Sequence, residues 1–360
     1  MAAKKCNSSL ALFAFSCDQF GFAEMRDLIT KTGGFCASHE LFHSNVFTDS
    51  FKNFFQHNEH EFIDKCFGGT MEVLLSRGFK VQGVVGCCLG LGVKNAKVSE
   101  TPMGESGTTS WYLGTFDKNS TYSLILENEK SDDMSLQNQL FTLQFKTYFK
   151  DGYGQMKLRV TTIQRKFGNI SKDAYASSFD QEAAIIMTAR CALAMSGLLD
   201  QKEITKWIDK RLIKLYSRFG EFTRQVPSSF RIHQSFELIP QFFYYLRKST
   251  FILNFAISVD EMHYNRMILM RENVSNCLVM IQPSILEYNC DSNDPQAVIC
   301  DISVMKDDVV ILFDTYFNVV IWHGGTIKDW RDEGYHEDPD YATLKAAMEN
   351  PLEDSKVKLK

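Results

Sequence analysis

The chain contains 360 residues, more than one hydrophobic core usually supports, so about two or three domains are expected. Hydrophobic residues make up 44% and charged residues 23% of the sequence, a composition that excludes disordered, collagenous and low-complexity proteins. The formal net charge of −5 argues against general attraction to nucleic acid, so no nucleic-acid partner is predicted. It leaves room for a local basic face.

The cysteine pattern and the apolar runs indicate a cytoplasmic protein. The 10 cysteines are scattered irregularly without a C-x-x-C pair, which predicts reduced thiols and no local zinc knuckle. No apolar run reaches the ~18 residues of a membrane-spanning helix. The stretch Leu10–Cys17 resembles the apolar part of a signal peptide, but no small-residue cleavage site follows it. A buried strand is therefore the favoured interpretation.

Residues 9–57 predict one strand-helix-strand-helix unit that is too small to fold alone. Strands are expected over 10–17 and 35–38, and helices over 22–30 and 48–56.

Residues 62–165 alternate short β-rich runs with turns. Strands at this spacing are typical of a β-sandwich or barrel. The expected strands cover residues 69–75, 80–86, 109–114, 122–127, 140–149 and 156–164.

The pattern becomes helical at Ser178. Ser178 and Gln181 have the spacing of a capping box, which predicts the start of a helix. A second helix is expected over 201–222. Its apolar residues recur every three or four positions and predict one buried stripe, made of Ile204, Trp207, Ile208, Leu212, Leu215 and Phe219.

A row of cations lies on the opposite side of that second helix. Lys206, Lys210, Lys214 and Arg218 follow one another at intervals of four and form a basic face. The default interpretation is a solvated face. The alternative is attraction to an anionic membrane or to an acidic partner.

The last part of the chain mixes helices and strands. Further helices are expected after Pro240 and Asp260, and strands over 298–303 and 309–323. Helices are then expected around Trp330 and Tyr341.

The sharpest chemical motif is HELFH at residues 39–43, a formal H-E-x-x-H sequence. On a helix, His39 and His43 would bind zinc while Glu40 polarised the bound water, with Glu61 as a further ligand. The motif follows the strand expected over 35–38, although the mechanism needs it within a helix. A zinc metallopeptidase is therefore kept only as an alternative function. We assign no catalytic or metal residue and predict a binding or scaffolding protein.

Blocks of sequence in differently patterned regions carry a family resemblance. They follow one another in collinear order from about residue 9 to about residue 355. The blocks are Leu10–Met25, Phe67–Thr70, Arg159–Ile163, Ser177–Ala184, Trp207–Lys210, Pro227–Arg231, Met280–Pro283, Leu312–Thr315 and His323–Tyr335. Together they resemble the Sec-twenty-three family, the GTPase-activating subunit of the COPII inner coat. The related cargo-binding subunit shares the architecture, but the detailed motifs favour the first family.

This resemblance implies an α+β multidomain fold. Residues 1–60 would be the remnant of an α/β (vWA-like) trunk domain and 61–168 a β-sandwich. Residues 169–274 would form an all-α helical domain and 275–360 an incomplete gelsolin-like α/β domain.

The resemblance also implies a cytoplasmic coat protein, peripheral on the endoplasmic reticulum membrane and on vesicles travelling to the Golgi. Its partners would be a Sar-type small GTPase, the cargo-binding COPII subunit in a heterodimer, and an outer-coat subunit with proline-rich segments. Tyr335 and Tyr341 are candidates to flank a groove for proline-rich peptides, with simple packing as the alternative.

Two functional features of the family fall outside the matched blocks. Family members activate the GTPase with an arginine finger, which stabilises charge on the transferring phosphoryl group. That arginine would follow Lys360, and Arg331 is not a substitute for it. The family's zinc-binding cysteines would precede residue 9, so no cofactor is expected. We therefore expect a fragment that is poorly soluble alone, with little GTPase stimulation and no enzymatic activity of its own. A non-activating adaptor is the further alternative.

Overall fold

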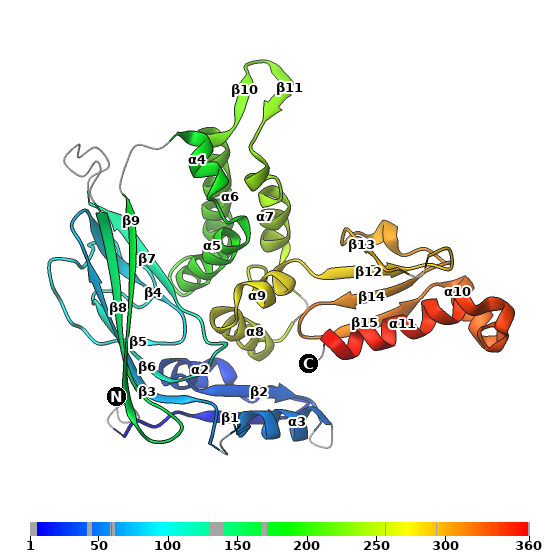
Figure 1. Ribbon diagram of the computed structural model, residues 1–360, viewed down its shortest axis with the longest axis horizontal. Coiled ribbons are helices and arrows are strands. Elements are labelled where there is room, and N and C mark those ends of the chain that lie inside the picture. The colour runs from blue at the N-terminus through cyan, green and yellow to red at the C-terminus, as the bar shows by residue number, and fades with distance from the viewer. Residues whose placement is uncertain are drawn as a thin grey trace. The chain divides into compact units, whose positions relative to one another are not determined.

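The computed structural model divides the chain into two compact units, Met1–Asn273 and Val274–Lys360 (Figure 1). Each unit has its own core and is described by itself. The described residues are 6–41, 45–57, 59, 62–129, 140–166, 171–255, 257–292 and 294–358.

The first unit begins with the strand-helix-strand-helix segment that the sequence predicts. β1 (Ala11–Phe15) and β2 (Phe35–His39) pair in parallel and are connected by α2 (Phe22–Lys31). α3 (Asn45–Phe54) follows and contributes aromatic rings to a cluster around Phe13. The ring centroids of Phe13 and its neighbours lie 5.5–6.3 Å apart, a spacing at which aromatic pairs attract one another.

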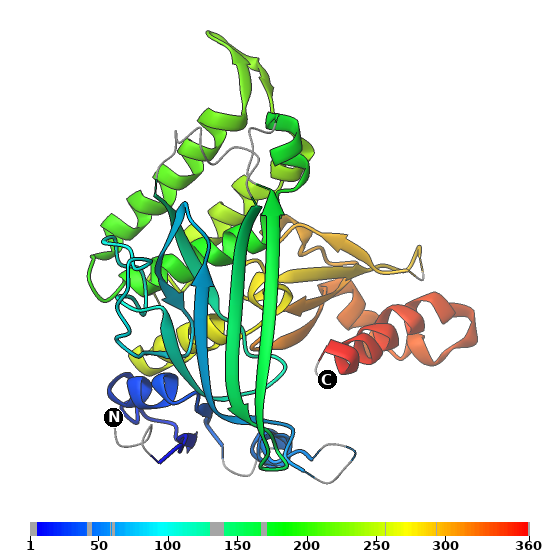
Figure 2. The same cartoon turned by 60° about the vertical axis from the view of Figure 1, so that its left-hand side comes forward.

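A β-sandwich follows in the first unit, as predicted. A five-stranded sheet has the order β5-β6-β3-β8-β9, and β4 and β7 form the second sheet. Val81 and Val84 from the second sheet pack against Val73 and Trp111 from the first, which places the core between the sheets. Figure 2 shows the long strands β8 and β9 running side by side. The strands are β3 (Cys66–Leu75), β4 (Phe79–Val85), β5 (Leu89–Gly90), β6 (Ser110–Phe116), β7 (Ser123–Asn128), β8 (Leu140–Lys150) and β9 (Met156–Lys166).

The rest of the first unit is largely helical. A two-stranded hairpin of β10 and β11 interrupts the helices after α6 (Figure 1). On α6, Ile204 and Ile208 of the predicted stripe are buried, whereas its other members are half-buried. The elements are α4 (Lys172–Ser177), α5 (Gln181–Met195), α6 (Gln201–Phe219), β10 (Glu221–Thr223), β11 (Val226–Arg231), α7 (Ile239–Lys248) and α8 (Val259–Arg271), with a short 3-10 helix, η2 (Gln234–Phe236).

The predicted capping box at the start of α5 is wrong. Asp180, and not Ser178, caps this helix, because its Oδ1 accepts a hydrogen bond from the backbone N–H of Ala183 at 2.9 Å. The hydroxyl of Ser178 donates instead to the carbonyl of Tyr175 in the preceding helix. The carboxylate therefore satisfies the free amides at the start of α5, and the serine belongs to the end of α4.

A buried arginine joins α5 to the sandwich. Arg190 is only 3% exposed. Its Nε donates to the carbonyl of Leu269 at 3.0 Å, and Nη1 donates to Ser123 Oγ at 3.1 Å. Nη2 donates to Thr121 Oγ1 at 2.8 Å and to the carbonyl of Glu272. The guanidinium thus connects α5, β7 and the end of α8 through hydrogen bonds that compensate its burial.

A buried carboxylate joins the other end of α8 to α2. Asp260 accepts hydrogen bonds from the backbone N–H groups of Phe20 at 2.7 Å, Gly21 at 2.9 Å and Ala23 at 3.3 Å. These amides lie at the start of α2, where backbone donors lack partners within the helix. A negative charge is also favourable at a helix N-terminus.

The second unit contains one antiparallel sheet with the order β13-β12-β14-β15. Val310, Leu312, Ile327 and Leu344 belong to a buried cluster that joins this sheet to α10 and α11. The elements are α9 (Val274–Ile281), β12 (Ser284–Tyr288), β13 (Gln296–Val298), β14 (Val310–Asp314), β15 (Val319–His323), α10 (Gly325–Asp332) and α11 (Ala342–Lys358), with 3-10 helices η3 (Ile302–Val304), η4 (Tyr335–Glu337) and η5 (Pro339–Tyr341).

Two strand predictions in this unit are corrected. The strand expected over 298–303 is wrong, because β13 ends at Val298 and η3 follows it. The strand expected over 309–323 is a hairpin of β14 and β15, which turns at Thr315–Asn318. Tyr316 adopts a φ of 71° in that turn, a conformation that a continuous strand excludes.

Candidate functional site

The predicted basic face lies at the surface of α6. Lys206, Lys210, Lys214 and Arg218 are all exposed, and in the described ranges none of them forms an ion pair. Like charges four residues apart on a helix repel each other by about 0.2–0.5 kcal/mol per pair. The helix therefore carries an electrostatic cost along this face that an anionic partner would relieve.

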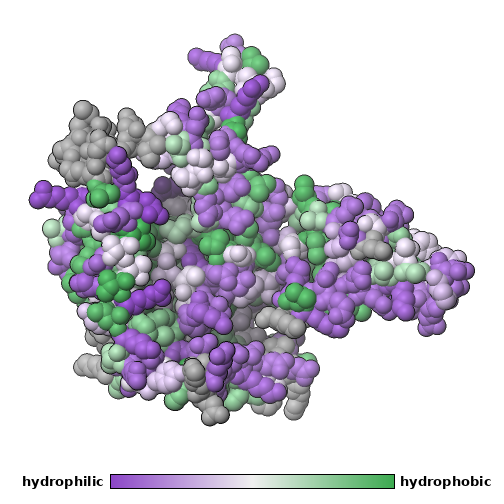
Figure 3. Space-filling view, in the orientation of Figure 1, coloured by the Kyte–Doolittle hydropathy of each residue, from purple (hydrophilic) through white to green (hydrophobic). Residues whose placement is uncertain are grey.

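The hairpin that follows α6 adds apolar side chains that sequence reasoning missed. Phe222 is 65% exposed, and Val226 and Phe230 are also exposed. Figure 3 shows both hydrophilic and hydrophobic surface on this hairpin, at the top of the view. The apolar residues Phe222, Val226 and Phe230 recur every four positions, so the sequence lacks the period-two alternation that would have indicated strands here.

The two candidate tyrosines of the second unit lie together. Tyr335 is in η4 and Tyr341 is in η5, and their ring centroids are 5.3 Å apart in an edge-on arrangement. The two residues are 40% and 46% exposed, so both rings are accessible. Exposed acidic residues lie close to both tyrosines in the sequence, namely Glu333, Glu337, Asp338 and Asp340.

The described part of the H-E-x-x-H motif, residues 39–41, does not lie within a helix. His39 is the last residue of β2, Glu40 follows it, and α3 begins only at Asn45. The Nδ1 atom of His39 accepts a hydrogen bond from the backbone N–H of Leu41 at 3.1 Å, which fixes a local turn. His43 and Glu61 lie outside the described residues. Within the described part of the chain, no group of His, Cys, Asp or Glu is arranged to hold a metal ion. A zinc peptidase would need this motif within a helix, so the alternative function is not supported by the structure.

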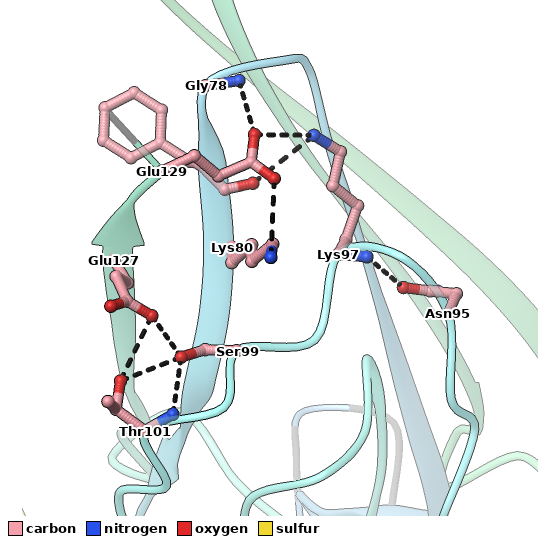
Figure 4. A network of polar contacts seen from close by, with 9 residues as sticks. Gly78, Lys80, Asn95, Lys97, Ser99, Thr101, Glu127 and Glu129 are labelled. Atoms are coloured by element: carbon pink, nitrogen blue, oxygen red, sulfur yellow. Dashed lines mark hydrogen bonds and ion pairs between the residues drawn. The ribbon is translucent and has the colours of Figure 1, made fainter. Parts of the chain in front are cut away.

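Paired carboxylates in the sandwich form a structural network (Figure 4). Glu129 Oε2 accepts a hydrogen bond from the backbone N–H of Gly78 at 3.2 Å, and its carboxylate lies within 3.9 Å of the Nζ atoms of Lys80 and Lys97. Glu127 likewise accepts hydrogen bonds from the hydroxyls of Ser99 and Thr101 (Figure 4). These contacts fix loops against β4 and β7 and leave neither carboxylate poised for acid-base chemistry.

Two family models match consecutive parts of the first unit and the beginning of the second. The Sec23/Sec24 beta-sandwich domain matches residues 66–168, and the Sec23/Sec24 helical domain matches residues 180–279. These matches define a protein of the Sec23/Sec24 class and confirm the α+β multidomain fold.

Similarity to curated proteins identifies the branch within this class. The chain is 39% identical over 352 residues to the protein transport protein SEC23 F of Arabidopsis thaliana, covering 97% of this chain and 45% of the relative. It is also 39% identical over 351 residues to SEC23 C of the same plant, covering 95% of this chain and 46% of the relative. The chain belongs to the Sec23 family, which confirms the resemblance found in the sequence. It spans a little under half of the length of these relatives.

A solved structure supports the fold. The crystal structure of the human COPII-coat protein Sec24c matches with a TM-score of 0.70 at 16% identity, covering 89% of this chain and 39% of that one. At this identity the likeness concerns the fold alone. In the described ranges, none of the helices combines the length and the apolar content that crossing a bilayer requires.

Proposed function

We propose that this protein is a COPII coat subunit that acts in transport from the endoplasmic reticulum to the Golgi, peripheral on the membrane and exposed to the cytoplasm. The observation that carries the proposal is the collinear similarity to SEC23 proteins over 97% of the chain. The matched sandwich and helical domains support it. The chain would act as a scaffold and would not catalyse a reaction by itself.

Its partners would be the cargo-binding coat subunit and a Sar-type small GTPase. We assign no arginine finger to the described residues, so binding and stimulation are separable here. The test combines size-exclusion chromatography with the cargo-binding subunit and a GTP hydrolysis assay with the GTPase. A stable complex with little stimulation is the expected result. Absence of any complex would overturn the proposal, and a stimulation of several hundred-fold would mean that a catalytic arginine lies in this chain.

The basic face of α6 would contact anionic lipid. A cation near an anionic leaflet contributes about 1 kcal/mol, so reversing two charges is expected to weaken vesicle binding by about 30-fold or more. The test is flotation with vesicles containing phosphatidylserine, using Lys210→Glu with Lys214→Glu. The matched control reverses Lys94 and Lys118, which are also exposed in the first unit. Equal loss in both double variants would indicate a general charge effect and exclude a membrane-binding face.

The tyrosine pair would bind proline-rich segments of the outer-coat subunit. Exposed aromatic rings pack well against the rigid extended conformation of proline-rich peptides. Tyr341→Ala is expected to weaken binding of a triple-proline peptide by about threefold to tenfold in a titration. Tyr244→Ala, at a tyrosine that is 56% exposed in the first unit, serves as the control. Unchanged affinity in Tyr341→Ala would assign this ring to packing.

A further inference from the structure

A pocket of about 390 Å³ opens in the first unit between α2, α8, the end of α5 and the end of β4. Its volume lies in the range of pockets that hold small ligands or short peptide segments. Cations line one part of it, and apolar side chains line another. The cations are Arg26, Lys31 and Arg266, accompanied by His263, and the apolar residues include Val84, Val85, Leu193, Met267 and Met270.

The guanidinium groups of Arg26 and Arg266 lie in the pocket lining with the imidazole of His263, and we name these three residues the cationic cluster. Arg26 Nη1 lies 2.9 Å from His263 Nδ1. A guanidinium can only donate, so Nδ1 of His263 accepts this hydrogen bond and the imidazole is neutral. Burial lowers the pKa of His263, and the charges of Arg26 and Arg266 lower it further. The same two causes, burial and the charge of Arg26, lower the pKa of Arg266.

The two terminal nitrogens of the Arg266 guanidinium make no hydrogen bond to the described residues. Its Nε donates to the carbonyl of Phe251 at 2.9 Å, which fixes the orientation of the group. Among the described residues, no acceptor takes a hydrogen bond from its two terminal nitrogens, and the side chain is half-buried along the pocket. These two nitrogens form the planar fork that binds a carboxylate through two parallel hydrogen bonds.

The nearby acidic groups are already engaged by the protein. Asp27 lies 3.2 Å from Lys31 Nζ and 3.3 Å from Arg26 Nη2 at the rim of the pocket, with 56% of its side chain exposed. Glu105 accepts a hydrogen bond from the backbone N–H of Gly90 at 2.9 Å. Asp260, in the first turn of α8, is buried against the start of α2. None of these carboxylates therefore forms an ion pair with Arg266.

We propose that this pocket binds the side-chain carboxylate of an acidic residue in a peptide segment of a partner protein. The carboxylate would accept two hydrogen bonds from the terminal nitrogens of Arg266, close to Arg26 and His263. The apolar part of the lining, where Met270 and Ala194 are half-buried, would contact the aliphatic part of the acidic residue and its neighbours. A free inorganic phosphate would leave this apolar part uncovered, so the lining favours a carboxylate on an apolar body.

The experiment is isothermal titration of the full chain with three pentapeptides. The first is capped at both ends and carries one central glutamate between leucines, and the second replaces that glutamate by glutamine. The third is the glutamine peptide with a free carboxyl terminus. Hydrogen bonds to charged groups contribute about 1.5–3 kcal/mol, so the glutamate peptide is expected to bind about tenfold or more tightly than either glutamine peptide. Equal binding of the first two peptides, or tightest binding of the third, would overturn the assignment to a side-chain carboxylate.

Variants then test the residues. Arg266→Lys keeps the charge but removes the planar fork, and it is expected to weaken binding of the glutamate peptide by about tenfold. Arg26→Gln provides a second variant at a more exposed position, with a thermal melt of both proteins to verify folding. Lys94→Gln, outside the pocket lining, is the matched control and is expected to bind like the unmodified chain. Undiminished affinity in both arginine variants, or displacement of the peptide by equimolar inorganic phosphate, would overturn the proposal.

Discussion

The two units of the molecule differ in the interactions that stabilise each of them internally. In the first unit, buried charged groups connect segments that are far apart in sequence, since Asp260 contacts Phe20 across 240 positions and Arg271 contacts Gly34 across 237. In the second unit, neighbouring antiparallel strands and the helices that follow them enclose an apolar core. Apolar cores stabilise both units, and in the first unit buried charged side chains add hydrogen bonds that join segments far apart in the sequence.

The difference concerns specificity as well as stability. A buried charge is unfavourable unless its hydrogen bonds are complete, so it selects the one arrangement in which its partners meet. Apolar contacts are non-directional and tolerate small rearrangements. We therefore expect single polar substitutions to disrupt the first unit while the second stays folded.

The largest expected effect is that of Arg190→Met. The variant removes the buried guanidinium that donates to the carbonyls of Leu269 and Glu272 and to the hydroxyls of Thr121 and Ser123, while the carbonyl of Glu272 still accepts a hydrogen bond from Thr121 Oγ1. An unsatisfied buried group costs about 1–3 kcal/mol, so we expect the first unit to lose about 3 kcal/mol or more of its free energy of unfolding. Backbone hydrogen exchange measures this loss, with protection of peptides from 274–358 unchanged.

The control for this variant is Arg247→Met. The Arg247 side chain is 54% exposed and lies 3.4 Å from Asp209, so its removal should change stability by about 0.5 kcal/mol or less. A similar small loss for Arg190→Met would contradict the role given to the buried arginine. Equal loss of protection in both units would contradict the separation between them.

A smaller effect is expected for Asp260→Asn. The amide retains one acceptor oxygen but loses the charge that three backbone N–H groups share in the native protein. We expect the first unit to lose about 1.5–3 kcal/mol, with faster exchange concentrated in α2. Glu261→Gln, at the exposed neighbouring position, is the control. If hydrogen exchange became faster by the same amount across the whole first unit, without an excess in α2, the effect of Asp260 would not be local to α2.

The smallest expected effect is a dependence on pH that both units share. The pKa values of His263 in the first unit and His323 in the second are lowered, each by burial first and by neighbouring arginines second. Asp260 and Glu24 oppose the shift at His263. In the unfolded chain a histidine titrates near pH ~6.5, so the unfolded state binds more protons than the folded state below that pH. The contribution of each histidine is therefore complete above pH ~6.5 and is lost as the pH falls toward the lowered folded-state value.

Hydrogen exchange of each unit between about pH 7.5 and 5 would detect this dependence as a change in its free energy of unfolding. His263→Gln should flatten the pH profile of the first unit only, and His323→Gln that of the second only. An unchanged slope in both variants would mean that carboxylates carry the acid sensitivity of both units.

Local patterns were sufficient to predict most elements of the first unit. The spacing of apolar residues identified α6, and it also separated the apolar side of that helix from Lys206, Lys210 and Lys214, because residues four apart on a helix share a face. The strands of the sandwich were found because short β-rich runs alternate with turns, and their bounds differ by a few residues. The capping error at Ser178 arose because Asp180, a stronger candidate at the helix boundary, was overlooked.

The features that the sequence did not predict are of two kinds. Some depend on contacts between distant parts of the chain, and others lie in segments whose apolar and polar residues follow no recognisable period. α9 spans only 8 residues, and its two polar residues, Ser275 and Asn276, are adjacent, which gives no helical periodicity to detect. Arg190 lies in the helix that the sequence predicts near Ser178, but its burial depends on partners contributed by the sandwich and by α8. The cationic cluster likewise combines residues 26 and 266, which no sequence spacing relates.

Helix α8 has a mechanical consequence. Its first turn anchors α2 through Asp260, and Arg271 at its last turn grips Asp117 and Gly34. At 13 residues it is about 20 Å long, so it acts as a rigid strut between these anchors. A ligand that bound to the middle of α8 and displaced it would disturb the contacts at both of its ends. The N-terminal segment and the sandwich would then shift together.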